Sequence, residues 1–211
     1  MASCFAETFV NTVLGEVGYQ CGPNKENKYA AELDQVDYFT GCGKKQNLDF
    51  CAVGLCWALW RSIVYPSAEQ DPESAKWSAH FFAYQSDSCD KAAVVKYLRQ
   101  YFADNNAVTT NPERGDFAFF QNDSGLYHCG AVTGWDNDHI YITEFNTEGG
   151  KVLTHTYNYS DIGHKIKDFG RPRYDGWSES DTAPSEPDQS KIVNAKVLYE
   201  NGVAKRVIID L

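Results

Sequence analysis

The stretch LDFCAVGLCWALW, residues 48–60, decides the fold of this chain. From Phe50 onward it is apolar on nearly every side of a helix, and the dipeptide Tyr65-Pro66 follows soon after. Asp49 is a suitable N-cap, and a helix usually ends before a proline, so the pattern predicts one helix over 50–64. A helix without a polar face is a buried helix. We therefore expect helix 50–64 to lie in the middle of the domain, with the other elements packed around it.

The segments on either side of this helix carry weaker helical patterns. The spacing of apolar residues predicts a first helix capped by Ser3, a short helical piece near 29–37, irregular chain over 67–87 and a third helix over 89–103 capped by Ser86 or Ser88. Together with helix 50–64, these elements place the helical part of the chain before residue 111.

Beyond Asn111-Pro112 the apolar residues alternate with polar ones, as they do in strands. Four segments separated by turn residues have this pattern: GDFAFFQ (115–121), HCGAVTGW (128–135), HIYITEFNT (139–147) and KVLTHTYNY (151–159). Helices followed by consecutive short strands are typical of the α+β class. We therefore predict N-terminal helices packed on an antiparallel sheet.

The C-terminal part differs in composition from the rest. Residues 176–190, GWSESDTAPSEPDQS, are acidic and rich in Ser and Pro, which is typical of a linker. Residues 191–211 contain two strand-like runs around Asn201-Gly202, a strong hairpin signal. We expect a main domain over 1–175, a linker over 176–190, and a hairpin over 191–211 that either stands alone or begins a further module.

Charge and cysteine content exclude several classes of function. The chain has 211 residues and a net charge of −10, without a Lys/Arg cluster, which argues against binding to nucleic acid or anionic lipid. The seven cysteines include no CxxC pair, so a zinc ribbon is not expected. The N-terminus lacks the pattern of a signal peptide, and no apolar run is long enough to cross a membrane. We expect synthesis in the cytoplasm and, for any action outside, release by another route than that of signal peptides.

Two cysteines lie in the central helix, and most buried cysteines are inert. Cys51 falls in the first turn, where free N–H groups and the helix dipole favour a thiolate. Cys56 lies deeper and on another side of the helix. Cys51 is therefore the candidate nucleophile, and an inert core thiol is the alternative for both.

A nucleophilic cysteine needs a base, and the base needs an orienting partner. His128 begins a predicted strand, and Glu144 and Asn146 lie two residues apart on the next one, so they share a face of that strand. In a hairpin, these side chains meet His128 only if the loop between the strands is odd in length or a bulge restores the phase. We expect Glu144 or Asn146 within hydrogen-bonding reach of the His128 ring.

Cysteine on a central helix, histidine on a strand and a polar residue on the next strand form the papain-like order. The sequence resembles the CHAP family, the cysteine- and histidine-dependent amidohydrolases/peptidases, in four segments over about residues 5–160: VGYQCGPNKENKYAAEL (17–33), FCAVGLCWALW (50–60), GDFAFF (115–120) and HCGAVTGWDNDHIYITEFNTEGG (128–150). It departs from the family pattern at Phe50, where Trp is commoner, at Gly54 and Cys56 within the helix, and at Phe145 between Glu144 and Asn146.

This resemblance implies a papain-like hydrolase that cleaves bacterial peptidoglycan, as an N-acetylmuramoyl-L-alanine amidase or as an endopeptidase of the stem peptide or cross-bridge. Carried over by motif, Cys51 is the nucleophile, His128 the base, Glu144 the orienting acid and Asn146 a fourth member. Gln46 and Asn47, shortly before the cysteine, are candidate oxyanion donors. The reaction needs no cofactor and no metal. A phage lysin that reaches the wall after release from the cell is the expected source.

Two other classes of function stay open at this point. The same fold can serve a virion or tail component that only binds wall glycopeptide, or an intracellular deamidase or effector. For the segment Asp136-Asn137-Asp138, a hairpin turn is expected rather than a calcium site, although carboxylates cluster there. The remaining histidines have no metal-ligand spacing: His80, His139, His155 and His164. The sequence alone does not determine the oligomeric state.

Overall fold

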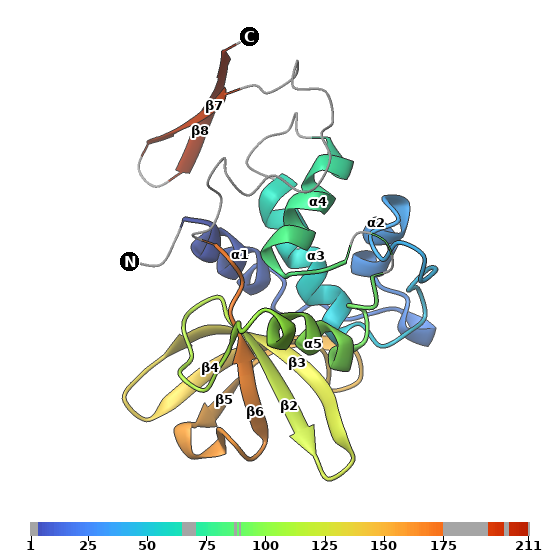
Figure 1. The fold of residues 1–211 in the computed structure, drawn as a ribbon, viewed down its shortest axis with the longest axis vertical. Coiled ribbons are helices and arrows are strands. Elements are labelled where there is room, and N and C mark those ends of the chain that lie inside the picture. The colour runs from blue at the N-terminus through green and yellow to red at the C-terminus, as the bar shows by residue number, and fades with distance from the viewer. Residues whose placement is uncertain are drawn as a thin grey trace.

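The computed structural model describes residues 4–64, 71–86, 88, 90–174, 194–200 and 203–210. Its helices are α1 (Cys4–Leu14), α2 (Lys28–Gln35), α3 (Cys51–Val64), α4 (Pro72–Phe82) and α5 (Val95–Asp104), with short 3-10 turns at Pro23–Lys25 and Tyr159–Asp161. The strands are β1 (Val108–Thr109), β2 (Phe117–Asn122), β3 (Gly125–Trp135), β4 (His139–Thr147), β5 (Lys151–Asn158), β6 (Ile166–Gly170), β7 (Asn194–Glu200) and β8 (Val203–Asp210). This order, helices first and sheet second, confirms the α+β prediction (Figure 1).

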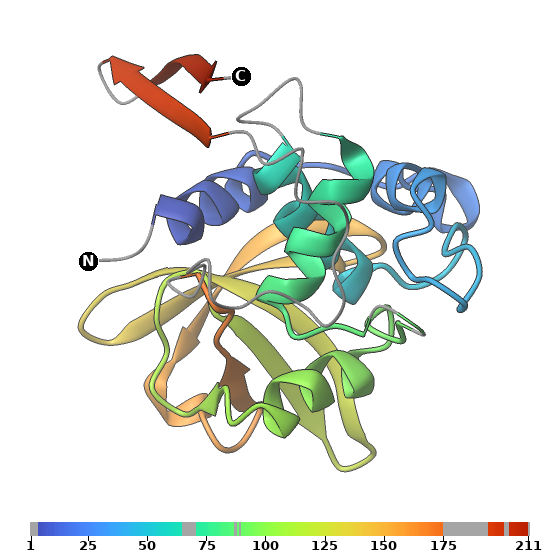
Figure 2. The same ribbon diagram turned by 45° about the horizontal axis from the view of Figure 1, so that its top comes forward.

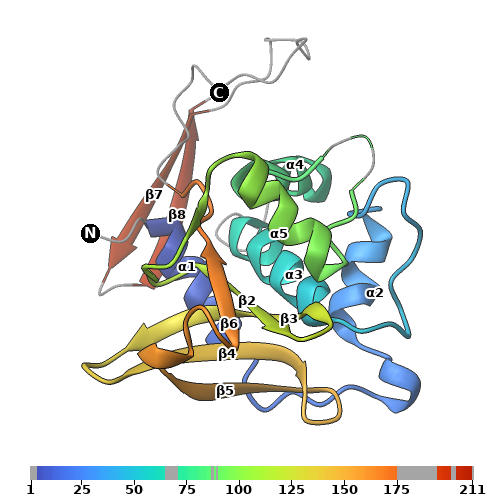
Figure 3. The same cartoon turned by 60° about the horizontal axis from the view of Figure 1, so that its bottom comes forward.

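Strands β1 to β6 form one six-stranded sheet in the order β1-β6-β2-β3-β4-β5, and every neighbouring pair is antiparallel. Residues 18–21 extend the β5 side, because Gly18 N–H donates to the Val152 carbonyl and Cys21 N–H donates to the Gly150 carbonyl. The helices lie together on one side of the sheet, as Figures 2 and 3 show. Strands β3 and β4, which carry the candidate site, are thus central strands held from both sides.

Helix α3 is the centre of this arrangement, as the opening stretch predicts. Its first ten residues, 51–60, are all buried, and it contacts α1, α2, α4, β3 and β4. The main core joins α3 to the helix-facing residues of the sheet, among them Phe117, Phe119 and Phe145. A second, smaller core is formed by the strand residues that point away from the main core, and it includes Phe120, Ile142 and Phe169. Because adjacent strand residues point to opposite faces, the run Phe117–Phe120 supplies both cores.

The region between α3 and the sheet corrects two predictions. The sequence pattern predicts irregular chain over 67–87, yet α4 spans Pro72–Phe82. Pro72 is its first residue, where proline is favoured, and Ala75, Ala79 and Phe82 form a buried stripe at helical spacing. The helix expected over 89–103 begins later, at Val95, because residues 90–94 form a turn in which Asp90 accepts from Ala92 N–H. The helix expected near 29–37 and the four expected strands are confirmed.

Several sequence-based expectations fall on residues outside the described part. These are the Ser3 cap, the Tyr65-Pro66 helix end, the whole linker over 176–190 and the Asn201-Gly202 turn. On either side of that turn, β7 and β8 pair with each other in an antiparallel register from Asn194↔Asp210 to Glu200↔Val203. The division into a domain, a linker and a hairpin module therefore stays a prediction. Within the described residues, helices of the length and hydrophobicity needed to cross a membrane are absent.

Candidate active site

Cys51 is the first residue of α3, the helix that contacts the central strands β3 and β4. The helical hydrogen bonds begin with Gly54 N–H donating to the Phe50 carbonyl at 2.7 Å, so the amides of residues 51–53 lie before the ladder. Ala52 N–H is one of them, and it helps to lower the pKa of Cys51. The predicted position of Cys51 in the first turn is confirmed, and the local backbone there favours a negative charge.

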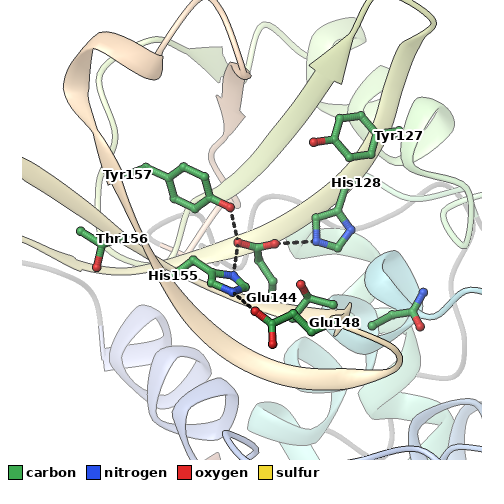
Figure 4. A pocket seen from close by; sticks show the side chains of 9 residues that line it. Tyr127, His128, Glu144, Glu148, His155, Thr156 and Tyr157 are labelled. Carbon is green, nitrogen blue, oxygen red and sulfur yellow. Dashed lines mark hydrogen bonds and ion pairs between the residues drawn. The ribbon is translucent and has the colours of Figure 1, made fainter.

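His128 lies on β3 and Glu144 on β4, and their side chains meet. The His128 ring nitrogen Nε2 lies 2.7 Å from Glu144 Oε2 (Figure 4). The carboxylate accepts from this nitrogen, and the interaction with Cys51 also raises the pKa of His128. The expectation that Glu144 or Asn146 reaches the ring is thus confirmed through Glu144.

The register explains how Glu144 comes to share the face of His128. Trp135 pairs with Ile140, so an even number of residues, 136–139, separates the paired positions. This register alone would place His128 and Glu144 on opposite faces of the sheet. Thr133 is an extra residue in β3, because the register shifts between Val132 and Gly134, and Val132 then pairs with Ile142. This bulge restores the phase, since a bulge adds one residue to one strand. Of the two alternatives, odd loop or bulge, the chain uses the bulge.

The electrostatics of the site favour an ion pair between Cys51 and His128. A hydrogen bond from the Cys129 thiol lowers the pKa of Cys51, burial opposes this, and the bond to His128 helps to bring the pKa to about 5. Burial alone would lower the pKa of His128, but its hydrogen bonds to Cys51 and Glu144 raise it to about 9. At neutral pH the geometry therefore holds a thiolate beside an imidazolium.

Glu144 is held by more than His128. It is 3% exposed, and its other oxygen, Oε1, accepts from Tyr157 Oη at 2.6 Å and from His155 Nδ1 at 3.0 Å. Burial would raise the pKa of Glu144, but the bonds from His128 and Tyr157 lower it below its usual value. Three donors thus converge on one buried carboxylate, which fixes its charge and its orientation (Figure 4).

Gly130 makes room for this carboxylate. It lies in β3 across from Glu144, and a Cβ on Gly130 would meet Glu144 Cγ at 2.8 Å and Ile142 Cγ2 at 2.6 Å. Both distances are far inside van der Waals contact. The glycine of the His-x-Gly segment is therefore a packing requirement of the site.

Gly54 has a similar role on the helix. A Cβ at Gly54 would lie 2.3 Å from Cγ of Phe145, the residue between Glu144 and Asn146. Phe145 is fully buried and packs edge-to-face on Tyr29 with ring centroids 5.0 Å apart. The two departures from the family pattern at residues 54 and 145 therefore compensate each other in volume.

Asn146 does not reach His128. A register shift between Glu144 and Thr147 and a positive φ of 57° turn Asn146 away, and its Nδ2 donates to Asp49 Oδ1 at 2.9 Å. Asp49 also accepts from Lys25 Nζ at 2.5 Å, and these bonds, first that from Lys25, lower the pKa of Asp49. The fourth predicted member thus ties β4 to the segment before Cys51. The described partners of Asp49 are these side chains rather than the α3 amides expected of an N-cap.

The two candidate oxyanion donors have other surroundings. Gln46 Nε2 donates to the Asn27 carbonyl at 2.5 Å, and its Oε1 accepts from Asn27 N–H at 3.3 Å. Asn47 is exposed at a φ of 64°, as in a turn. The structure therefore gives Gln46 a local bonding role and places Asn47 in a loop.

The second cysteine of α3 and the acidic segment after β3 have structural roles. Cys56 is fully buried, accepts from Gln85 Nε2 at 3.3 Å, and burial raises its pKa well above the usual value. Asp136 accepts from Asp138 N–H and His139 N–H at 2.9 and 2.8 Å, as in a hairpin turn. Among the described residues, no group of three or more His, Cys, Asp or Glu side chains is arranged to hold a metal ion.

A pocket of about 590 Å³ opens beside this site. It is lined by Tyr127, His128, Glu144, Asn146, Thr147, Glu148, His155, Thr156 and Tyr157 (Figure 4). Sequence reasoning did not find Tyr157, His155 or Cys129 as site residues. The alternation of β5 carries the signal for the first two, because residues 155 and 157 share a face of that strand. For Cys129 the signal is its place beside His128.

Comparison with known proteins gives distant likenesses in structure and none in sequence. No family model matches the chain, and no curated protein matches it in sequence. In structure it is similar to Ly7917 in complex with the hydrolyzing product of MDP, with a TM-score of 0.46 and 15% identity. A second structure of Ly7917 gives a TM-score of 0.45 and 17% identity. Each alignment covers 79% of this chain and 62% of the Ly7917 chain.

Proposed function

We propose that this protein is a cysteine hydrolase that cleaves an amide bond of bacterial peptidoglycan, as an N-acetylmuramoyl-L-alanine amidase or a peptide endopeptidase. The observation that carries the chemistry is the 2.7 Å hydrogen bond between His128 Nε2 and Glu144 Oε2. Cys51 at the start of α3 accompanies this pair, since His128 lowers the pKa of Cys51 and Cys51 raises the pKa of His128. The substrate class rests on the resemblance of four sequence segments to the CHAP family. A phage lysin that acts on the wall after release is the corresponding biological role.

The mechanism is acyl transfer through a thioester. The Cys51 thiolate attacks the amide carbonyl carbon, and amides at the start of α3 donate to the oxyanion that forms. As this intermediate collapses, the His128 imidazolium gives its proton to the leaving nitrogen, and the free amine departs. His128 then takes one proton from water, the hydroxide attacks the thioester, and the thiolate leaves. The product is the carboxylic acid, which gives its remaining proton to the solvent. Glu144 holds the ring in place and stabilises its charged form throughout.

The test is hydrolysis of purified cell walls from a panel of bacteria, followed as loss of turbidity. Labelling the new amino groups and identifying the labelled residues distinguishes an amidase, which frees L-alanine, from an endopeptidase. The matched control is Cys51→Ser, which should be inactive. The proposal fails if the protein clears none of the walls, or if Cys51→Ser clears them as fast as the native chain.

The same experiment separates the two other classes of function. Sedimentation of the protein with walls that it does not degrade would indicate a virion-associated wall-binding protein. Release of ammonia from a glutamine side chain, without wall hydrolysis, would indicate a deamidase. The converged donors on Glu144 favour catalysis, because wall binding alone does not need a charged carboxylate held behind a histidine.

A further inference from the structure

His155 lies on β5 and is a pocket residue that the proposed mechanism does not use. It pairs with Ile142 of β4, so it shares a face of the sheet with Glu144 and lies diagonal to it. Its Nδ1 lies 3.0 Å from Glu144 Oε1, the oxygen that does not bind His128. Its Nε2 lies 3.4 Å from Oε1 of Glu148, in the turn after β4. Both ring nitrogens of His155 thus face carboxylates (Figure 4).

The chemistry of these two contacts determines where His155 carries a proton. A carboxylate only accepts hydrogen bonds, and a neutral imidazole has one N–H whereas a charged one has two. The contact with Glu144 is the shorter one, and the Glu144 side chain is 4% exposed, against 57% for Glu148. A single proton therefore belongs on Nδ1, because an unpaired buried carboxylate oxygen costs more than an exposed one. His155 can donate to Glu144 as a neutral or as a charged ring.

Tyr157 also donates to Glu144 Oε1, at 2.6 Å, but it constrains this oxygen less. A hydroxyl hydrogen turns about its C–O bond, so Tyr157 can follow an oxygen that moves. The N–H of His155 lies in the plane of a rigid ring, and Glu148 contacts the other nitrogen of that ring. With Oε1 held by His155, Glu144 keeps Oε2 directed at His128 Nε2, 2.7 Å away.

We propose that His155 is a positioning residue of this site, whose Nδ1–H holds Oε1 of Glu144 so that Oε2 stays bonded to His128. This inference rests on the proposed function only in taking His128 and Glu144 as the acid–base pair. His155 acts through Glu144 and not on the reacting atoms. Loss of its donor should therefore loosen the bond between His128 and Glu144 and lower turnover, without weakening the binding of substrate.

The chain offers a matched set of variants for this test. His155→Asn keeps an amide N–H close to the place of Nδ1, whereas His155→Gln moves it to about the place of Nε2, away from Glu144. His155→Leu keeps a side chain of similar size without a donor. His139→Leu is the control, because His139 also faces a carboxylate, with its Nδ1 3.1 Å from Asp136 Oδ1, and neither residue lines the pocket.

The experiment is the rate at which the Nε2 proton of His128 exchanges with water near neutral pH, measured by NMR on protein with isotope-labelled histidine. His128 carries this proton at neutral pH, and the bond to Glu144 protects it. Exchange should be about 10–100-fold faster in His155→Leu and His155→Gln than in the native chain. His155→Asn and His139→Leu should exchange at close to the native rate. In wall hydrolysis, kcat should fall by the same order in the Leu and Gln variants with KM unchanged, and recover in the Asn variant.

A native exchange rate in His155→Leu overturns the proposal, as does exchange in His155→Asn as fast as in His155→Leu. Thermal unfolding of each variant shows whether it folds. Should His155→Leu fail to fold, His155→Asn and His155→Gln decide, because they carry the same amide one methylene apart, and equal exchange rates in these two would overturn the proposal. Proton exchange needs no peptidoglycan. Failure of wall hydrolysis therefore refutes the proposed function without touching this inference.

Discussion

Replacing Glu144 by glutamine tests the central hydrogen-bond chain with almost no change of shape. All three partners of the carboxylate are donors: His128 Nε2, Tyr157 Oη and His155 Nδ1. A carboxamide has one acceptor oxygen and one donor nitrogen. In Glu144→Gln at least one of the three donors therefore faces an NH₂ group, and the negative charge beside the imidazolium is lost.

The magnitude follows from the surroundings of His128. Hydrogen bonds to charged groups contribute about 1.5–3 kcal/mol, which corresponds to about 1–2 pKa units. Glu144 is one of two partners that raise the pKa of His128 to about 9. A histidine whose pKa is raised keeps its proton up to the raised pKa. When the partner that raises the pKa is removed, the histidine loses its proton at a lower pH. In Glu144→Gln the imidazolium should therefore lose its proton near pH 7–8, about 1–2 units earlier.

The assay is kcat/KM for wall hydrolysis from pH 4 to 10 in steps of about 0.5, a spacing finer than the expected shift. The native profile should rise near pH 5, as Cys51 ionises, and fall near pH 9, as His128 loses its proton. In Glu144→Gln the falling limb moves toward acid, and the plateau drops by about 10²–10⁴-fold, the usual contribution of acid–base catalysis. The control for the shift of the falling limb is Glu148→Gln. It makes the same change at a carboxylate of the pocket that, among the described residues, has no hydrogen bond to His128. A falling limb that stays in place in Glu144→Gln would refute the assignment of Glu144.

Three further predictions concern the nucleophile, the packing and the chain's end. Cys51→Ser should abolish wall hydrolysis and keep the fold, whereas Cys56→Ser should keep most of the activity and lose about 1–3 kcal/mol of stability through a buried hydroxyl. Turnover and chemical denaturation of both variants check this. Equal loss of turnover in the two variants would overturn the assignment of Cys51 as the nucleophile. Gly130→Ala should cost about 1–3 kcal/mol of unfolding free energy by overpacking, because the new Cβ would overlap Glu144 and Ile142. It should also lower turnover by displacing Glu144, so a variant with native turnover would contradict this packing role of Gly130. Deletion after Gly176 should leave a folded, active domain with weaker wall binding, because an isolated hairpin adds little to another domain's stability; a truncated chain that does not fold would make the hairpin part of the domain.

The sequence predicts the three residues of the hydrogen-bond chain but not what surrounds them. Cys51 follows from its place at a helix start, and Glu144 follows from strand parity with His128. The Thr133 bulge could be stated only as a condition, because periodicity does not reveal where an extra residue lies. Asn146 shares parity with Glu144, yet the irregular backbone after Glu144 turns it toward Asp49.

The missed elements and partners have a common physical origin. Helix α4 carries Ala75 and Ala79 in its buried stripe, and such small residues give a weak apolar pattern although they allow close packing on α3. Tyr157 and His155 reach Glu144 across a strand pair, so their contact depends on the register of β4 with β5. The local sequence pattern predicts helices, strands and the face of a strand on which each side chain lies. Contacts between elements depend on how the elements pack, which the local pattern does not contain.

The fit of Phe145 against Gly54 couples helix α3 to strand β4, so residues 54 and 145 are expected to change together in evolution. Gly54 cannot be exchanged alone, since any side chain on residue 54 enters the space of the Phe145 ring. A smaller residue at 145 alone would leave a cavity against Gly54. In chains that share ancestry with this one, we expect a small residue at one position to be inherited with a large residue at the other. A chimaera that takes only the nucleophile helix from such a relative should then be less stable than either parent. Transfer of the helix together with strand β4 should restore stability, because the complementary volumes travel as a pair.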